Sequence, residues 1–251
     1  MNAVSVVDVR DAGTRMAAVL GLSRSAVGVR LVSSQENVPE AGQILDHHRY
    51  CQALMLAVQG GNVLLDAAGV ACPAAAAAFG FRPLPEGLRS GKRLVGFGIV
   101  ANEAVGRRMF ELMPALTPGS MQGLHLFPLE KAEHVPDVVV EGAVEALMWI
   151  SLAYLHATGG ERLQSTTAVL QATCVDSTIV PYLEKRLNLS YGCYGCRDAT
   201  DLAADEAVLG FPASMLSPVV AHLEYLAQKA IPASRSKRAW AVLQKNEATG
   251  Q

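Results

Sequence analysis

The sequence has 251 residues, of which 51% are apolar and 18% are charged, and its formal net charge is −2 at pH 7. This composition is enough for one large domain with a substantial core, and the near-balance of charges excludes the clustered basic face that nucleic-acid-binding proteins need. Proline and charged residues interrupt every apolar stretch before it is long enough to cross a bilayer.

In the first half of the chain, helical and strand-like segments alternate between glycine and proline residues. We expect helices over 11–20, 50–58 and 102–113, and strands over 26–32, 61–66 and 121–127. Cys72-Pro73 begins an alanine-rich helix over 74–79, because proline favours the first helical position and the residue before it then forms the cap.

In the second half, we expect a strand over 137–141 and the longest helix over 143–156. A helical segment over 168–183 is interrupted by Pro181, and a short strand over 189–191 leads into a loop that carries Cys193 and Cys196. The last helix begins at Ser217-Pro218 and ends near residue 229, and residues 233–251 form a flexible tail. The sequence therefore predicts an α/β (or α+β) fold with mixed sheets, as a single domain over 1–251.

The spacing of four cysteines indicates an internal duplication. Cys51 begins a helix that leads through a turn and a strand to Cys72, and Cys174 leads in the same way to Cys193. Twenty residues separate the first two cysteines and 18 separate the second two. We therefore expect two pseudo-repeated halves, 24–113 and 137–228, which face one another around a cysteine-lined centre.

The fifth cysteine, Cys196, completes a C-x-x-C motif with Cys193, and glycines flank both residues. Iron–sulfur clusters are held by cysteine thiolates near turns and helix N-termini, where backbone N–H groups can bond the sulfurs. The first hypothesis is therefore a four-iron (4Fe-4S) cluster, held by Cys193, Cys196 and two of Cys51, Cys72 and Cys174. It would serve a redox or small-molecule-activating role.

Three alternatives remain open for the cysteines. A structural zinc ion needs four N/S ligands, usually from two paired knuckles, and the sequence has one C-x-x-C pair. Cys193 and Cys196 could instead cycle between dithiol and disulfide, as in a thiol redox protein. The cysteines could also be buried apolar residues of a non-enzymatic ligand-binding protein.

Arg49 and Arg197 each lie within two residues of a cysteine and are candidates to bind an anion or to balance a negatively charged cluster. Asp176 follows Cys174 by two residues, as a helix cap or a proton donor. We expect a small-molecule or electron-transfer partner, no nucleic acid and no membrane, and leave a homodimer open. The N-terminus lacks a signal-peptide pattern and the cysteine count is odd, so we expect a cytoplasmic protein with reduced thiols.

The cysteine-centred segments resemble an uncharacterised family of bacterial and archaeal proteins, the domain of unknown function, family 169. The resemblance covers roughly residues 25 to 228, and its name implies no activity. The segments that carry it are Arg49-Tyr50-Cys51-Gln52-Ala53-Leu54, Ala71-Cys72-Pro73, Leu170-Gln171-Ala172-Thr173-Cys174-Val175-Asp176 and Gly192-Cys193-Tyr194-Gly195-Cys196-Arg197.

Overall fold

The structure is a computed structural model that describes residues 4–40, 42–168 and 170–249. Its strands are β1 (Val27–Ser33), β2 (Gln43–Ile44), β3 (Val63–Asp66), β4 (Met121–Pro128), β5 (Val138–Glu141), β6 (Asn188–Ser190) and β7 (Val208–Pro212). Its α-helices are α1 (Val6–Leu20), α2 (Tyr50–Val58), α3 (Pro73–Ala78), α4 (Glu86–Arg89), α5 (Lys92–Gly96), α6 (Glu103–Glu111), α7 (Val144–Thr158), α8 (Val180–Glu184), α9 (Tyr194–Ala199), α10 (Leu216–Ala227), α11 (Ala230–Arg235) and α12 (Arg238–Thr249). Two short 3-10 helices, η1 (Leu129–Lys131) and η3 (Ala213–Met215), and a π-helix, η2 (Ala172–Ile179), complete the described chain.

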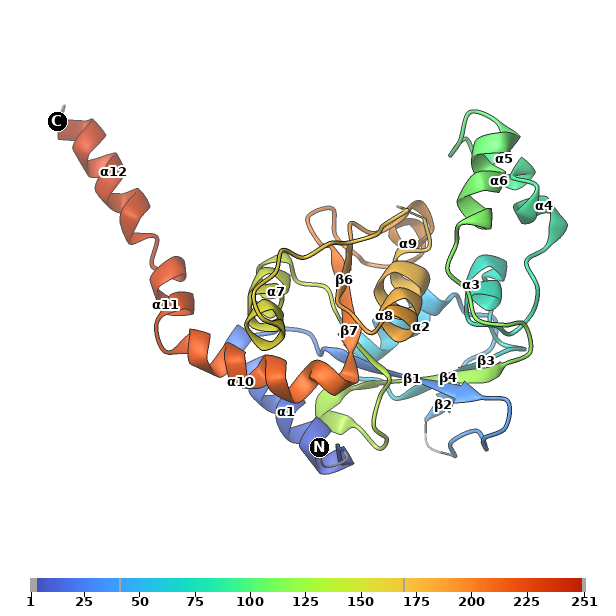
Figure 1. Ribbon diagram of the computed structural model, residues 1–251, viewed down its shortest axis with the longest axis horizontal. Coiled ribbons are helices and arrows are strands. Elements are labelled where there is room, and N and C mark those ends of the chain that lie inside the picture. The colour runs from blue at the N-terminus through green and yellow to red at the C-terminus, as the bar shows by residue number, and fades with distance from the viewer. Residues whose placement is uncertain (1–3, 41, 169, 250–251) are drawn as a thin grey trace.

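The strands form one mixed sheet in the order β2-β3-β4-β1-β5-β7-β6 (Figure 1). The β2–β3 pair is parallel and the other neighbouring pairs are antiparallel. A sheet with helices on both faces is an α/β architecture, so the predicted fold class is confirmed. Within the described ranges, no helix is both long and apolar enough to cross a membrane.

The two faces of the sheet bury different cores, as the alternation of side chains along a strand requires. In β5, Val138 and Val140 face one core and Val139 faces the other. The first core contains α2, α3 and the π-helix, together with four of the cysteines; the second contains α1, α7 and α10. The cysteines therefore lie on one side of the sheet, away from the longest helices.

The two halves of the sheet have matching element orders. β3, β4 and β1 form one half and β6, β7 and β5 form the other, with β1 paired to β5 at the centre. In each half a helix leads to a strand, β3 or β6, and then to a cysteine that caps a short helix, Cys72 before α3 and Cys193 before α9. β4 and β7 each end in a proline followed by a 3-10 turn. The pseudo-repeated halves and their duplication stay predictions.

Three segments differ from the elements that we expected. The loop that carries the C-x-x-C motif is the start of helix α9, and the helical segment over 168–183 becomes the π-helix followed by α8. The first helix begins at Val6, where Ser5 and Asp8 form a reciprocal capping box. Within the segment expected to be a tail, residues 238–249 are helix α12, which projects away from the body in Figure 1.

Candidate functional site

All five cysteines line one pocket of about 350 Å³. Its floor comes from the starts of α2, α3 and α9 and from the π-helix, and its opposite wall comes from α4, α5 and α6. The five thiols are free, with no disulfide between them. Residues that are up to 145 positions apart in the chain, from Cys51 to Cys196, thus share one cavity.

Cys51 and Cys72 occupy helix N-termini in the first half of the chain. Cys51 is the second residue of α2, where the side chain of Gln52 accepts the backbone N–H of the cap residue Arg49 at 2.9 Å. Cys72 caps α3, with Pro73 at the first helical position, as predicted. Burial, followed by the nearby Cys193 and Cys72 thiols, raises the pKa of Cys51 to about 11. An unliganded Cys51 is therefore a neutral thiol at neutral pH.

Cys174 lies in the π-helix, a rare element that often marks functional sites. Gln171, the residue directly before the π-helix, has a left-handed backbone with φ 54°. Its carbonyl oxygen accepts hydrogen bonds from the N–H groups of Val175 and Asp176 and from the Cys174 thiol. Burial raises the pKa of Cys174 well above the usual thiol value, and the nearby Cys72, Cys193 and Cys51 thiols add to the effect. Cys174 thus stays protonated unless a cation occupies the pocket.

Cys193 and Cys196 form a hydrogen-bonded pair at the start of α9. The backbone N–H of Cys193 donates to the sulfur of Cys196 at 3.0 Å, and that of Cys196 donates to the sulfur of Cys193 at 3.3 Å. The Cys196 thiol, helped by backbone N–H groups of Ala172, Cys196 and Gly195, lowers the pKa of Cys193, while the same pairing raises the pKa of Cys196. Cys193 therefore loses its proton readily, and Cys196 keeps its own.

A buried polar network joins the π-helix to β6 behind the cysteines. Asp176 is 3% exposed, and its carboxylate accepts hydrogen bonds from Thr167 and Ser190, each at 2.7 Å. Asn188 donates to the backbone carbonyls of Asp176 and Thr166, each at 2.8 Å. Because Asp176 lies inside the π-helix and Gln171 is the residue that caps it, the expectation that Asp176 is a helix cap is wrong. Its contacts give it a structural role, as an anchor for the segment that carries Cys174.

Replacing Asp176 with asparagine should raise the free energy of unfolding by about 2 kcal/mol near pH 8. Burial is the main cause that raises the pKa of this carboxyl from 3.8 to about 6. The folded protein therefore bears a penalty for the charge above that pH. Below the unfolded value of about 4 the carboxyl is neutral in both states, so the gain should vanish there. Asparagine keeps an oxygen that can accept from Thr167 and Ser190.

Urea unfolding of both proteins at about pH 8, 6 and 4 measures this dependence. The exposed Asp205→Asn substitution is the matched control and should give no pH-dependent gain. A gain that does not change with pH, or a loss of stability in Asp176→Asn near pH 8, would contradict the assignment.

The two arginines take different positions. Arg49 lines the pocket, where its guanidinium donates to the carbonyl of Gly195 at 3.1 Å and pairs with Asp198 at 3.4 Å. Arg197 does not line it, and its guanidinium donates to the carbonyls of Tyr191, Ala203 and Glu206. A cofactor-binding role stays a prediction for both, and the contacts of Arg197 commit it to holding the loop after α9.

The glycines of the motif also differ from one another. Gly192 has φ 87°, a left-handed conformation that strains other residues, and a Cβ there would meet Leu202 and Arg197 at 3.1–3.2 Å. Gly195 has open space where its Cβ would lie. Gly192 is therefore needed for the turn into α9, whereas the backbone around Gly195 leaves room for a side chain.

Comparison with known proteins places this arrangement in a family. The profile of the uncharacterised ArCR proteins, domain of unknown function family 169, matches residues 15–222. The chain belongs to this family. An uncharacterised protein of Methanocaldococcus jannaschii, MJ0308, is 26% identical over 229 residues, which cover 90% of this chain and 97% of that protein. No solved structure matches the chain. The resemblance inferred from the cysteine segments is confirmed, and all five cysteines lie inside the matched region.

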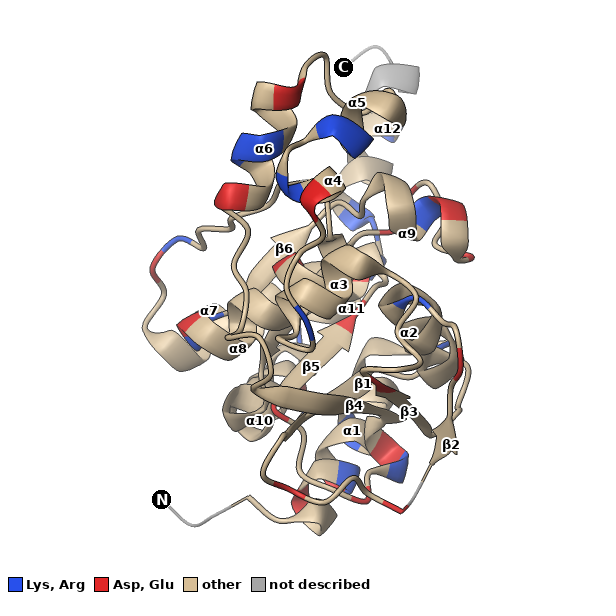
Figure 2. Ribbon diagram, turned by 90° about the vertical axis from the view of Figure 1, so that its right-hand side faces the viewer, with Lys and Arg blue, Asp and Glu red and all other residues tan. Residues whose placement is uncertain are grey.

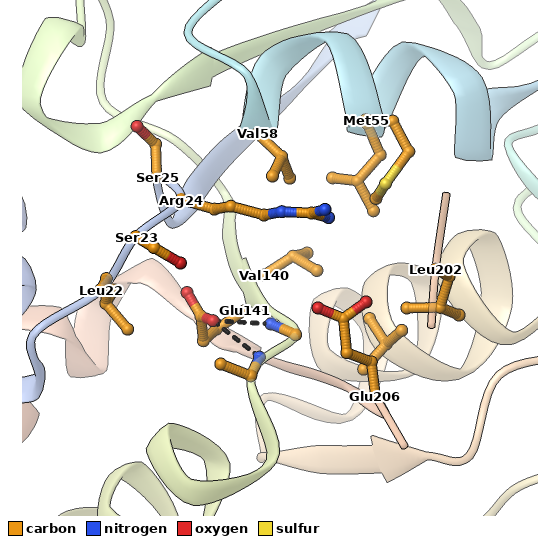
Figure 3. A pocket seen from close by; sticks show the side chains of 14 residues that line it. Leu22, Ser23, Arg24, Ser25, Met55, Val58, Val140, Glu141, Leu202 and Glu206 are labelled. Carbon is orange, nitrogen blue, oxygen red and sulfur yellow. Dashed lines mark hydrogen bonds between the residues drawn. The ribbon is translucent and has the colours of Figure 1, made fainter. Parts of the chain in front are cut away.

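This ArCR-family chain has a second, smaller pocket of about 70 Å³, between α2 and the end of β5 (Figure 3). The buried Glu141 lies in its wall, but one of its oxygens accepts the N–H groups of Gly142 and Ala143, each at 2.9 Å, so the carboxylate closes the turn after β5. Arg24 at the same pocket pairs with Asp201 at 3.1 Å. Each of these two charged groups already has its own partner, and we assign this pocket no ligand.

Two residue groups could not be found from the sequence. The wall opposite the cysteines, with Arg93, Phe97 and Phe110, is brought to the site by the fold and carries no local motif. The π-helix breaks the period of 3.6 on which helix recognition depends, so it reads as an ordinary helix with a proline near its end. The left-handed Gln171 before it carries no sequence signal, because glycine and asparagine are the usual residues in that conformation.

Proposed function

We propose that this ArCR-family protein binds an iron–sulfur cluster of the four-iron class in the cysteine pocket, for a redox or small-molecule-activating role. The observation that carries the proposal is the convergence of all five cysteines, from separate segments of the chain, on one cavity. The cysteine side chains are short, and they lie at helix starts or in the π-helix. The backbone therefore fixes the positions of the thiols before any ligand binds.

The chemistry of the pocket fits such a group. Several backbone N–H groups point to the Cys193 sulfur, and amide hydrogen bonds to sulfur are among the protein's means of tuning a cluster. Arg49 lies at the wall next to Gly195, where it also pairs with Asp198. A bound cluster would supply a centre for electron transfer or for activation of a small molecule.

The spacing of the donors bears on the choice between a cluster and a single zinc ion. Four sulfurs around one zinc ion lie roughly 3.8 Å apart, as Zn–S bonds of about 2.3 Å in a tetrahedron require. Over the described residues, no group of three or more His, Cys, Asp or Glu side chains is close enough to hold one metal ion. A cluster of several atoms holds its cysteine ligands further apart than one zinc ion does, so the proposal does not require such a close-set group.

Iron and acid-labile sulfide analysis of the anaerobically purified protein, with its visible absorption spectrum, tests the proposal. We expect a brown protein with iron and sulfide in equal amounts. Because Cys51 and Cys174 have raised pKa values, cluster uptake must release protons, and it should weaken as the pH falls. A colourless protein with stoichiometric zinc, or one with five titrating thiols and no metal, would contradict the proposal.

A second candidate is thiol redox chemistry, which the hydrogen-bonded Cys193–Cys196 pair favours. A thiolate on Cys193 could attack a small disulfide, such as oxidised glutathione, and release one of its thiols. Cys196 would then displace the second thiol, so that the protein gains a disulfide as the small molecule gains two electrons and two protons.

In the metal-free protein, iodoacetamide should therefore label Cys193 first, with a midpoint below about pH 8, the usual range of free thiols. Mass spectrometry of the digested protein at a series of pH values measures it. Cys196→Ala removes the main group that lowers the pKa of Cys193, and it should raise the midpoint by about one pH unit. Even labelling of all five cysteines, or an unchanged midpoint in Cys196→Ala, would contradict this account.

A further inference from the structure

The wall of the pocket opposite the cysteines has a composition of its own. It contains Phe97, Ile99 and Phe110 from α5, α6 and the segment between them, together with Arg93. Phe97 is 58% exposed, and an aromatic side chain of this size is usually buried. Phe110 and Ile99 belong to a small separate cluster that α4, α5 and α6 form beside the main core, whereas Phe97 projects from it into solvent. The wall is therefore apolar, accessible and rimmed by one cation.

This cation differs from the other arginines of α4, α5 and α6 in its ion pairing. Basic residues are frequent on α5 and α6, as the blue segments in Figure 2 show, and α4 carries Arg89. Arg89 pairs with Glu86, and Arg107 and Arg108 pair with Glu111. Across the described parts of the chain, Arg93 forms no ion pair, although it lines the pocket.

The other charged residues of the pocket do not neutralise Arg93. Arg49 and Asp198 also line it, and they pair with each other at 3.4 Å. The pocket therefore carries one net free positive charge on its apolar wall, in addition to whatever occupies its cysteine end. A guanidinium matches the two oxygens of a carboxylate and binds them in a bidentate manner.

We propose that the pocket accepts a small aromatic or branched apolar carboxylate. Its carboxylate lies on the guanidinium of Arg93, its apolar body lies against Phe97 and Ile99, and its far end reaches towards the cysteines. The volume of about 350 Å³ lies within the range of small-molecule sites. The inference rests on the proposed function, because the far end of this ligand would contact the cluster bound by the cysteines.

Isothermal titration calorimetry with 4-phenylbutyrate and its uncharged amide tests the inference on the protein as purified, at fixed ionic strength. The two probes share size and aromatic body and differ in charge. Wild type should bind the carboxylate about fivefold more tightly than the amide, as an exposed ion pair permits. Arg93→Gln should remove this preference without changing the affinity for the amide. Phe97→Ala should weaken both probes, and both substitutions are at exposed positions where folding is not at risk.

Lys92→Gln is the matched control, because Lys92 is the exposed neighbour of Arg93 and does not line the pocket. It should keep the preference. Equal binding of the two probes to wild type, or a preference that survives in Arg93→Gln or disappears in Lys92→Gln, overturns the inference. Iron content and the visible spectrum are recorded on the same samples. Brown protein without the preference refutes the inference alone, whereas colourless protein with it refutes the proposed function alone.

Discussion

Replacing Cys193 with serine should lower the iron bound per chain by about tenfold or more, measured after anaerobic purification or reconstitution. Cys193 is the thiol that the protein prepares best for a metal, since a neighbouring thiol and several backbone N–H groups stabilise its thiolate. A serine hydroxyl in the same place offers a harder donor that rarely ligates iron–sulfur clusters. The loss should be visible as bleached absorption, with the far-ultraviolet circular dichroism unchanged.

The same substitution at each of the other four cysteines completes the experiment. If four thiols hold the cluster, three of these four substitutions will also remove the iron, and the remaining one identifies the free thiol. Leu88→Met is the matched control, because Leu88 lines the same pocket and the change conserves its volume. Iron retained in all five cysteine variants, or lost in Leu88→Met, would refute the assignment of the ligands.

Replacing Gly210 with alanine should lower the free energy of unfolding by about 3 kcal/mol, which for a chain of this size lowers the Tm by about 6–12 °C. Gly210 lies on β7 directly beneath the π-helix. An added Cβ would lie 1.8 Å from the carbonyl oxygen of Ser177 and 2.7 Å from its carbon. Because these are backbone atoms, the π-helix would have to move away from the sheet, together with Cys174 and Asp176. We therefore expect a lower iron content as well.

Gly123→Ala is the control for this prediction. Gly123 lies on β4, the strand of the other half of the sheet that corresponds to β7, and the nearest atoms to its added Cβ lie at 3.8–4.0 Å. Ordinary contact of this kind should leave the Tm within a few degrees of wild type. Equal melting temperatures for the two variants would show that the close approach of β7 and the π-helix is not a constraint on the fold.

Several parts of the fold could be predicted from sequence because local signals were strong. The helix over 50–58 was found at its bounds, as was the start of α3, where Pro73 follows its capping cysteine. Each of these helices combines an apolar run with a clear start signal, so tertiary contacts do not shift its start. The spacing of the cysteines also predicts which segments of the chain meet at the site.

The rest of the site depends on contacts that no local pattern encodes. Asp176 looked like a cap because aspartate is common there, yet its hydrogen bonds to Thr167 and Ser190 come from segments that fold back on the π-helix. Arg93 lies 81 residues before Cys174, and the two line the same pocket only because α4, α5 and α6 pack as one group against α3. Which face such a group presents is decided by packing, not by periodicity.

Anomalous diffraction at the iron absorption edge, from crystals of the anaerobically purified protein, tests the central claim most directly. The account predicts anomalous density inside the cysteine pocket, within bonding distance of Cys193 and at least two other cysteine sulfurs. Density that appears only at the zinc edge, or a pocket that holds none while Cys193 and Cys196 are joined as a disulfide, would contradict it.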